Sequence, residues 1–128
     1  MILISGYFNN LHFTECRLGQ PVVENNTVKV RVSNLFIMKG HPLSTEGVSL
    51  VSGVLVFVGA SRSIRKLAEY IGDPKNPDGF KDEYSLTDIE EVGGDERAEL
   101  FRMEGVAEQP LAWIEWEIRA RQFQLYVD

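Results

Sequence analysis

One cysteine, two histidines and several closely spaced carboxylates are the side chains best suited to chemistry in this sequence. Cys16 follows His12 by four residues, with Glu15 between them. If this stretch is a strand, His12 and Cys16 share one face and Glu15 points to the other, because side chains alternate along a strand. The three therefore do not converge on one ion, and we expect no metal site, a packed Cys16 and a surface His12.

Cys16 could also act as a nucleophile, which requires a nearby base and a site for an oxyanion. His12 and His41 are the two histidines of the chain, and no supporting motif surrounds the cysteine. These observations favour a buried, inert thiol. A single cysteine also excludes a disulfide within the chain.

Residues 111–127 contain the clearest pattern and a pair of carboxylates. Ile114, Trp116 and Ile118 alternate with polar residues, which predicts a strand with one face in a core. Glu115 and Glu117 share the other face, where they could serve acid–base chemistry in a cleft that excludes water. An ion-pair ladder on a solvated face is the favoured alternative, each exposed pair contributing ~0–1 kcal/mol. The apolar positions change phase afterwards, which predicts a bulge or bend near Arg121 or Gln122.

Trp113 lies on the polar face of that predicted strand, among the acids. A large aromatic side chain in such a place is either covered by another element or exposed, and exposed aromatics are enriched at interfaces. The candidate recognition patch consists of Trp113 with Tyr126 and the acids Glu115, Glu117, Glu90, Glu91, Asp95 and Glu96.

Residues 61–72 predict an amphipathic helix. Ile64, Leu67 and Ile71 recur at helical spacing, and Gly72 is a typical residue at a helix end. The free amides at the start of this helix, beside Arg62 and Arg65, could bind an anion. The preceding glycine turn satisfies neither the Walker nor the dinucleotide-binding pattern.

The remaining segments predict a mainly β (α+β) fold of about seven strands. An antiparallel β-sandwich and a strongly curved sheet carrying the helix both fit, in one domain over residues 1–128. Strands are expected at 1–5, 12–18, 27–38, 48–58, 98–103 and 112–127, with a loop at 73–83. A break is expected at Ser52 and Gly53. Residues 84–92 fit a strand and a short helix equally well.

Charge is distributed unevenly along the chain. The net charge is −6, but residues 69–108 hold thirteen acidic and four basic side chains, a net charge of −9. Such a surface repels nucleic acid and can steer a basic protein partner, whereas a solvated region kept soluble by its acids is the simpler reading. No apolar run approaches the ~20 residues that span a bilayer, so we expect a soluble, cytoplasmic protein without membrane contact or cofactor.

Both ends of the chain resemble small bacterial immunity proteins of polymorphic toxin systems. The similarity lies in Gly6-Tyr-Phe-Asn-Asn-Leu-His12 and in Trp113-Ile-Glu-Trp-Glu-Ile followed by Phe123-Gln-Leu. The sequence departs from that pattern at Phe13, where those families usually place an acid. The resemblance implies a protein that binds and inhibits a toxin.

These observations together predict a non-enzymatic protein-binding module, of which an immunity-type inhibitor is the most concrete form. One alternative is a small-ligand-binding or hydrolytic domain with a cleft near the start of the predicted helix. A second alternative is a structural subunit of an assembly. A homo-oligomer is compatible with all three.

Overall fold

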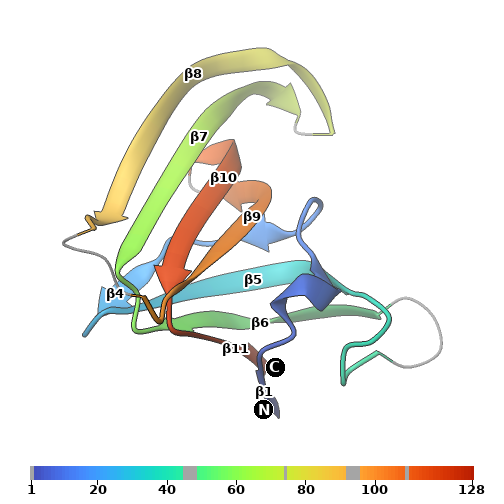
Figure 1. Cartoon of the computed structure of the whole chain (residues 1–128). Coiled ribbons are helices and arrows are strands. Elements are labelled where there is room, and N and C mark those ends of the chain that lie inside the picture. Colours follow the sequence, from blue (N-terminus) through green and yellow to red (C-terminus); the bar gives the residue numbers. More distant parts are fainter. Residues whose placement is uncertain (1, 45–48, 74, 92–95, 109) are drawn as a thin grey trace.

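The computed structural model describes residues 2–44, 49–73, 75–91, 96–108 and 110–128, and its strands form one eleven-stranded sheet (Figure 1). A 3-10 turn, η1, covers Phe8–Asn10. The strands are β1 (Ile2–Ser5), β2 (Leu11–His12), β3 (Arg17–Leu18), β4 (Val22–Glu24), β5 (Thr27–Ile37), β6 (Ser49–Val58), β7 (Arg62–Asp73), β8 (Asn76–Ile89), β9 (Glu99–Glu108), β10 (Leu111–Ala120) and β11 (Gln122–Val127).

Two long bent ribbons form the centre of this sheet. β6 runs into β7 and β10 runs into β11, and the two ribbons pair antiparallel, β6 with β11 and β7 with β10. Arg121 lies at the bend between β10 and β11, and its backbone N–H donates to the Val58 carbonyl at 3.0 Å. Burial changes there from even positions in β10 to odd ones in β11. The predicted bend near Arg121 is confirmed.

The bend divides the sheet into two halves that face each other across the core. The lower half in Figure 1 contains β1, β11, β6 and β5, and the upper half contains β9, β10, β7 and β8. β3 joins the halves, pairing antiparallel with β5 and parallel with β9. The largest fully buried side chains include Trp116, Phe57, Leu55 and Ile114, which come from both halves. One continuous cluster of buried residues therefore holds the bent sheet together.

The predicted helix at 61–72 is wrong, because these residues form strand β7. β7 pairs along most of its length with β8 and β10. Its face toward the core carries Ser63 and Arg65, so the strand lacks the apolar alternation by which strands are recognised, and helical spacing remained the stronger signal. Gly72, with φ of +85°, lies in β7 at a register shift next to the β7–β8 hairpin rather than at a helix end.

Strand β8 also corrects the loop predicted at 73–83 and settles the ambiguity that follows. It begins at Asn76 and continues through Ile89, so the predicted element at 84–92 is a strand up to Ile89. β6 passes through the predicted break at Ser52 and Gly53 without interruption. The irregularity lies instead on the opposite strand, between Val32 and Leu35 of β5. A Cβ on Gly53 would stand 2.0 Å from the Tyr126 carbonyl oxygen, so close approach of backbones accounts for the glycine.

The mainly-β class is confirmed, with strands at five of the six segments where whole strands were expected; at 12–18 the structure places two short strands and a turn instead. No helix in the described ranges is long and apolar enough to cross a membrane.

Candidate functional site

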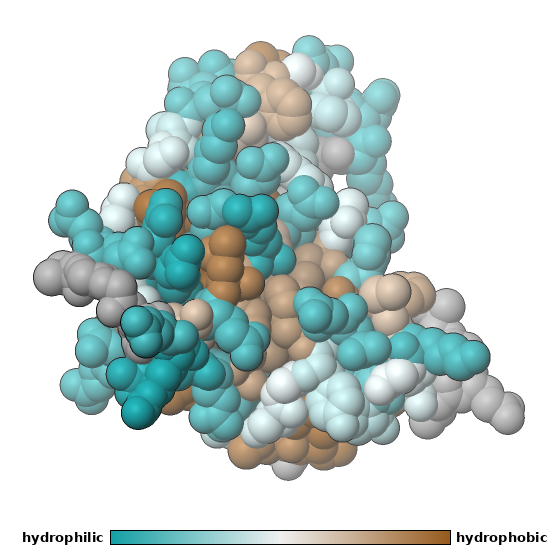
Figure 2. All heavy atoms as spheres, in the orientation of Figure 1, coloured by the Kyte–Doolittle hydropathy of each residue, from teal (hydrophilic) through white to brown (hydrophobic). Residues whose placement is uncertain are grey.

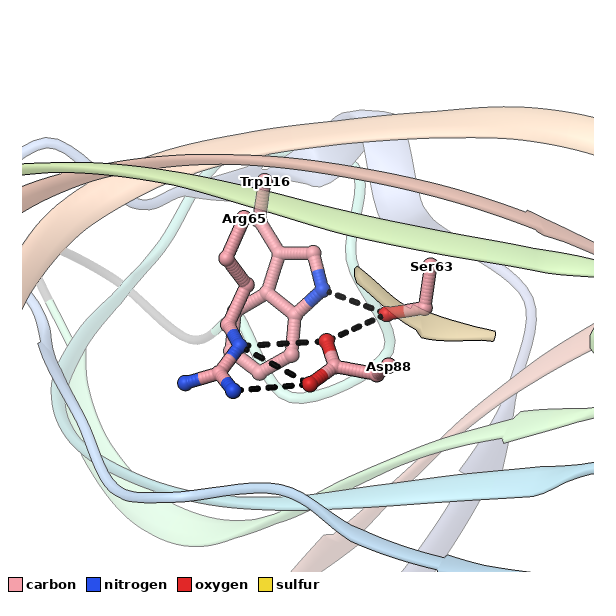
Figure 3. Close-up of polar contacts among 4 residues, drawn as sticks. All are labelled: Ser63, Arg65, Asp88 and Trp116. Atoms are coloured by element: carbon pink, nitrogen blue, oxygen red, sulfur yellow. Dashed lines mark hydrogen bonds and ion pairs between the residues drawn. The ribbon is translucent and has the colours of Figure 1, made fainter. Parts of the chain in front are cut away.

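The densest group of polar side chains lies on the core side of the upper half, where Ser63 and Arg65 of β7 meet Asp88 of β8 and Trp116 of β10 (Figure 3). Asp88 can turn inward because the β7–β8 register shifts between Ser63 and Ile64. The Arg65 guanidinium donates to both carboxylate oxygens of Asp88, at 2.7–3.1 Å. The Arg65 Cζ atom also lies 5.4 Å from the centroid of the Trp116 ring.

Hydrogen bonds close this cluster. Trp116 Nε1 donates to Ser63 Oγ at 2.9 Å, and Ser63 Oγ in turn donates to Asp88 Oδ2 at 2.9 Å. Ser63 and Trp116 are buried, and the side chains of Arg65 and Asp88 are only 14% and 8% exposed. Ser63 has no exposed surface, and the cluster links β7, β8 and β10 to one another within the core.

The two arginines of the predicted anion site are both engaged with carboxylates. Arg65 forms the fork with Asp88, and the helix start that motivated the site is replaced by a strand. Arg62 points to the opposite face of β7, where it lies 3.8 Å from Glu91 and 3.9 Å from Glu117. An anion would have to displace these carboxylates. The predicted ligand-binding or hydrolytic cleft near a helix start has no helix to form it.

The outer face of the upper half, which points away from the core, carries an ion-pair ladder beside the bend. Glu117 Oε1 forms an ion pair with Arg102 Nε at 3.2 Å, across the β9–β10 ladder, and Glu117 also contacts Arg62. Glu91 contacts Arg62 and Arg119, the latter at 3.9 Å. These side chains are 32–71% exposed, so each pair contributes about 0–1 kcal/mol. Glu117 therefore belongs to an ion-pair ladder on a solvated face, the arrangement that the sequence favoured over acid–base chemistry.

Glu115 has a different environment from Glu117. It lies directly opposite Glu104 across the β9–β10 ladder and opposite Lys66 across the β7–β10 ladder. Opposed residues of a ladder share a face and lie about 5 Å apart at Cβ, so Glu104 and Glu115 repel each other. Within the described part of the chain, neither carboxylate forms an ion pair.

Trp113 occupies the neighbouring row of the same outer face. It lies opposite Ala68 on one side and Val106 on the other, and its side chain is half-buried. Glu115 is two residues further along the same strand, and Glu104 lies diagonally across the ladder. Both carboxylates are therefore neighbours of the indole on this face. We call Trp113, Ala68, Val106, Glu104 and Glu115 together the Trp113 patch.

A cavity of about 620 Å³ adjoins this part of the sheet. Glu104, Glu115 and Glu117 are among its lining residues, and the Leu11–Thr14 segment lines another side. Its lining residues also include the central side chains Met103 and Trp116. Met103 and Trp116 face the core, so this hollow lies on the opposite side of β9 and β10 from the outer face that carries the side chains of the acids.

The other predicted patch residues lie elsewhere. Tyr126 of β11 is opposite Leu3 and Val54 in the lower half, beyond the bend from Trp113. Glu90 directly follows Ile89, the last residue of β8, and Glu96 is exposed. Asp95 lies outside the described residues. The structure thus groups Trp113 with Glu115, and places Glu91 with Glu117 in the ion-pair ladder.

Cys16 is fully buried, and burial raises the pKa of its thiol to about 12. Such a thiol has almost no thiolate at neutral pH, which agrees with an inert, packed residue. His12 is exposed and stacks edge-on against Phe36, as expected for a surface residue. His41 is buried, and desolvation lowers its pKa. Among the described residues, no group of three potential ligands is placed to hold a metal ion.

Sequence reasoning missed Glu104, Val106 and the Arg65–Asp88 pair. Glu104 and Val106 alternate with buried Met103 and Ala107 in β9, a pattern that the sequence displays but that does not reveal the register with β10. The register is what makes Glu104 and Glu115 neighbours. Comparison with protein-family models, with curated proteins and with solved structures finds no match to this chain, so the geometry of the site itself must carry the functional argument.

Proposed function

We propose that the chain is a non-enzymatic protein-binding module, and that its Trp113 patch receives an arginine side chain of a basic partner. The observation that carries this proposal is the opposed pair Glu104 and Glu115 beside the half-buried Trp113. Two like charges held opposite each other destabilise the free protein by a few tenths of a kcal/mol. A bound cation would convert that repulsion into two attractions.

Arginine suits this patch better than lysine does. A guanidinium is planar, stacks on an indole face and presents several N–H donors to carboxylates, whereas an ammonium is a strongly hydrated point charge. Stacking on Trp113 would leave the donors free to reach Glu104 and Glu115. The net charge of −9 over residues 69–108 would add long-range attraction and raise the association rate at low salt.

An immunity-type inhibitor is the specific form that the ends of the sequence suggest. Such an inhibitor would present the Trp113 patch and the surrounding acids to a basic surface of its toxin. The test is co-purification with a toxin encoded beside the gene, followed by binding measurements at low and high salt. If the neighbouring toxin does not associate at low salt, this specific form is abandoned, while the module can still be tested with peptides.

The module is tested by titrating two peptides, acetyl-(Arg-Val)4-amide and acetyl-(Lys-Val)4-amide, into the protein and measuring Kd in 20 mM salt by calorimetry. We expect the arginine peptide to bind at least fivefold more tightly. We also expect Glu115→Gln to weaken its binding about tenfold, roughly the worth of one charge-assisted hydrogen bond.

Glu24→Gln is the matched control, because Glu24 is exposed on β4 in the lower half and the substitution changes the net charge equally. We expect this control to change Kd by less than twofold. Equal weakening by both substitutions would mean that net charge alone attracts the peptide, and the Trp113 patch would lose its role.

A further inference from the structure

Among the described residues, the main strand path ends at β1 and β8, while the short strands β2 and β4 pair only with β5; the two ends of the path differ in chemistry. β8 carries Pro77, Lys81 and Glu83, residues of the types by which natural proteins prevent edge-to-edge pairing. β1 has the sequence Ile-Leu-Ile-Ser, with no charge and no proline. Its neighbour β11 (Gln122–Val127) also contains no acidic or basic residue.

We propose that β1 pairs antiparallel with β1 of a second copy of this chain, so that one sheet continues through a symmetric dimer. The proposal concerns the lower half of the molecule and is independent of the Trp113 patch. Open edges present unpaired N–H and C=O groups, and a strand of the same kind satisfies them.

Exposed apolar side chains at this edge support an occupant of like chemistry. Ile2 is 52% exposed and Leu3 is 48% exposed. On the outer face, Leu3 lies opposite Tyr126 of β11, and Tyr126 lies opposite Val54 of β6; Tyr126 and Val54 are half-buried. Figure 2 shows apolar atoms gathered at the lower rim, where Figure 1 places β1. Pairing with a second copy would remove this apolar surface from water.

Symmetry and the pleat restrict the register. A two-fold axis perpendicular to the sheet places the outer faces of both copies on one side, and directly opposed residues share a face. An axis at Leu3 and an axis at Ile4 both meet this condition. We place the axis at Leu3, because Ile2 then lies opposite Ile4 and all three pairs are apolar, whereas an axis at Ile4 would set Leu3 opposite Ser5. A shift by one residue would set the outer face of one copy against the inner face of the other.

The arrangement of charge favours this edge over the other. β8 is the last strand in the sheet order and β1 is the first, so the acidic strands of two joined copies lie at opposite ends of the dimer. Pairing through β8 would instead bring two acidic edges together. A contact of four residues per strand is small, so we expect a dissociation constant in the micromolar range.

Sedimentation equilibrium of the full chain from 1 to 200 µM tests the dimer. We expect a mass that rises toward twice the 14.5 kDa of one chain, and a Leu3→Lys variant that stays monomeric because two ammonium groups would face each other. Phe80→Lys is the matched control, since Phe80 is 51% exposed on the opposite edge strand. A wild-type protein that is monomeric throughout, or a Leu3→Lys variant that dimerises like the wild type, would overturn the proposal.

A Leu3→Cys variant tests the register directly. Cross-strand partners lie about 4.5–5.5 Å apart at Cα, within the range that a disulfide spans. Cys16 is buried, so the introduced thiol is the reactive one. We expect mild oxidation to give a covalent dimer in Leu3→Cys and not in Val22→Cys, whose side chain is 55% exposed on β4. Equal cross-linking of both variants, or none in either, contradicts the register.

Discussion

Removal of the Asp88 carboxylate is the sharpest test of how the upper half is held together. The Arg65 side chain is 14% exposed, and Asp88→Ala removes the two-oxygen partner of its guanidinium together with the acceptor of the Ser63 hydroxyl. Breaking a buried ion pair by removing one partner costs 3–5 kcal/mol, and residual solvent contact at Arg65 places the expected loss near the lower end, at about 3 kcal/mol.

That loss corresponds to a measurable change in melting temperature. The entropy of unfolding is about 2.1 cal/mol/K per residue, or about 0.27 kcal/mol/K for 128 residues, so 3 kcal/mol lowers Tm by about 11 °C. Urea unfolding followed by tryptophan fluorescence gives the free energy, and calorimetry gives Tm. Asp82→Ala is the control, because Asp82 is exposed on the same strand, and we expect a change below 0.5 kcal/mol.

A double substitution separates loss of the pair from loss of packing. Arg65→Met with Asp88→Leu removes both charges, and apolar replacements of a buried pair are often neutral or stabilising. The cycle is completed by the single variants Asp88→Leu and Arg65→Met. We expect Asp88→Leu to lose about 3 kcal/mol, as Asp88→Ala does, and the double variant to lie within about 1 kcal/mol of the wild type, which gives a coupling free energy of at least 2 kcal/mol. A loss below 1 kcal/mol in Asp88→Ala, or additive losses in the double variant, would refute the reasoning.

Three further predictions concern single residues. Gly105→Ala should destabilise the protein by about 2 kcal/mol in urea unfolding, because the new Cβ would lie 2.8 Å from Cys16 Sγ and 3.0 Å from the Cys16 carbonyl oxygen, whereas Gly19→Ala, with contacts of 3.4 and 3.6 Å, should cost under 1 kcal/mol. The Cys16 thiol, with its pKa of about 12, should react with Ellman's reagent at pH 8 only when denaturant unfolds the chain. Burial lowers the pKa of His41, so as pH falls the unfolded state binds the proton before the folded state does. The free energy of unfolding should therefore fall as pH drops below 6.5. His41→Asn keeps an acceptor for the Leu43 N–H, and its free energy of unfolding should fall less over the same pH range.

The parts of the fold that the sequence predicts are those with a clean difference between the two faces of a strand. β5 and β10 alternate buried and exposed residues, and the change of phase at Arg121 could be read directly from the apolar positions. β7 could not be read in this way. Its core-facing side carries Arg65 because Asp88, brought from β8 by a register shift, neutralises that charge. A local pattern contains no information about a partner twenty-three residues away.

The candidate site shows the same division between local and long-range information. The placement of Trp113 and Glu115 on one outer face follows from alternation in β10 alone. The opposition of Glu104 to Glu115 depends on the β9–β10 register, which alternation within a single strand does not contain. The repulsion between these carboxylates, which carries the functional proposal, could be found only once the ladder was known.

The central position of β10 and β11 has a consequence for synthesis of the chain. β10 lies between β9 and β7, and β11 lies between β1 and β6, so no part of the chain before residue 111 can complete the sheet. Before residues 111–127 are made, β1 has no partner, and β6 and β7 are paired on one side only, with β5 and β8. Completion of the sheet therefore waits for residues 111–127, and until then the partly made chain exposes apolar strand edges that favour aggregation.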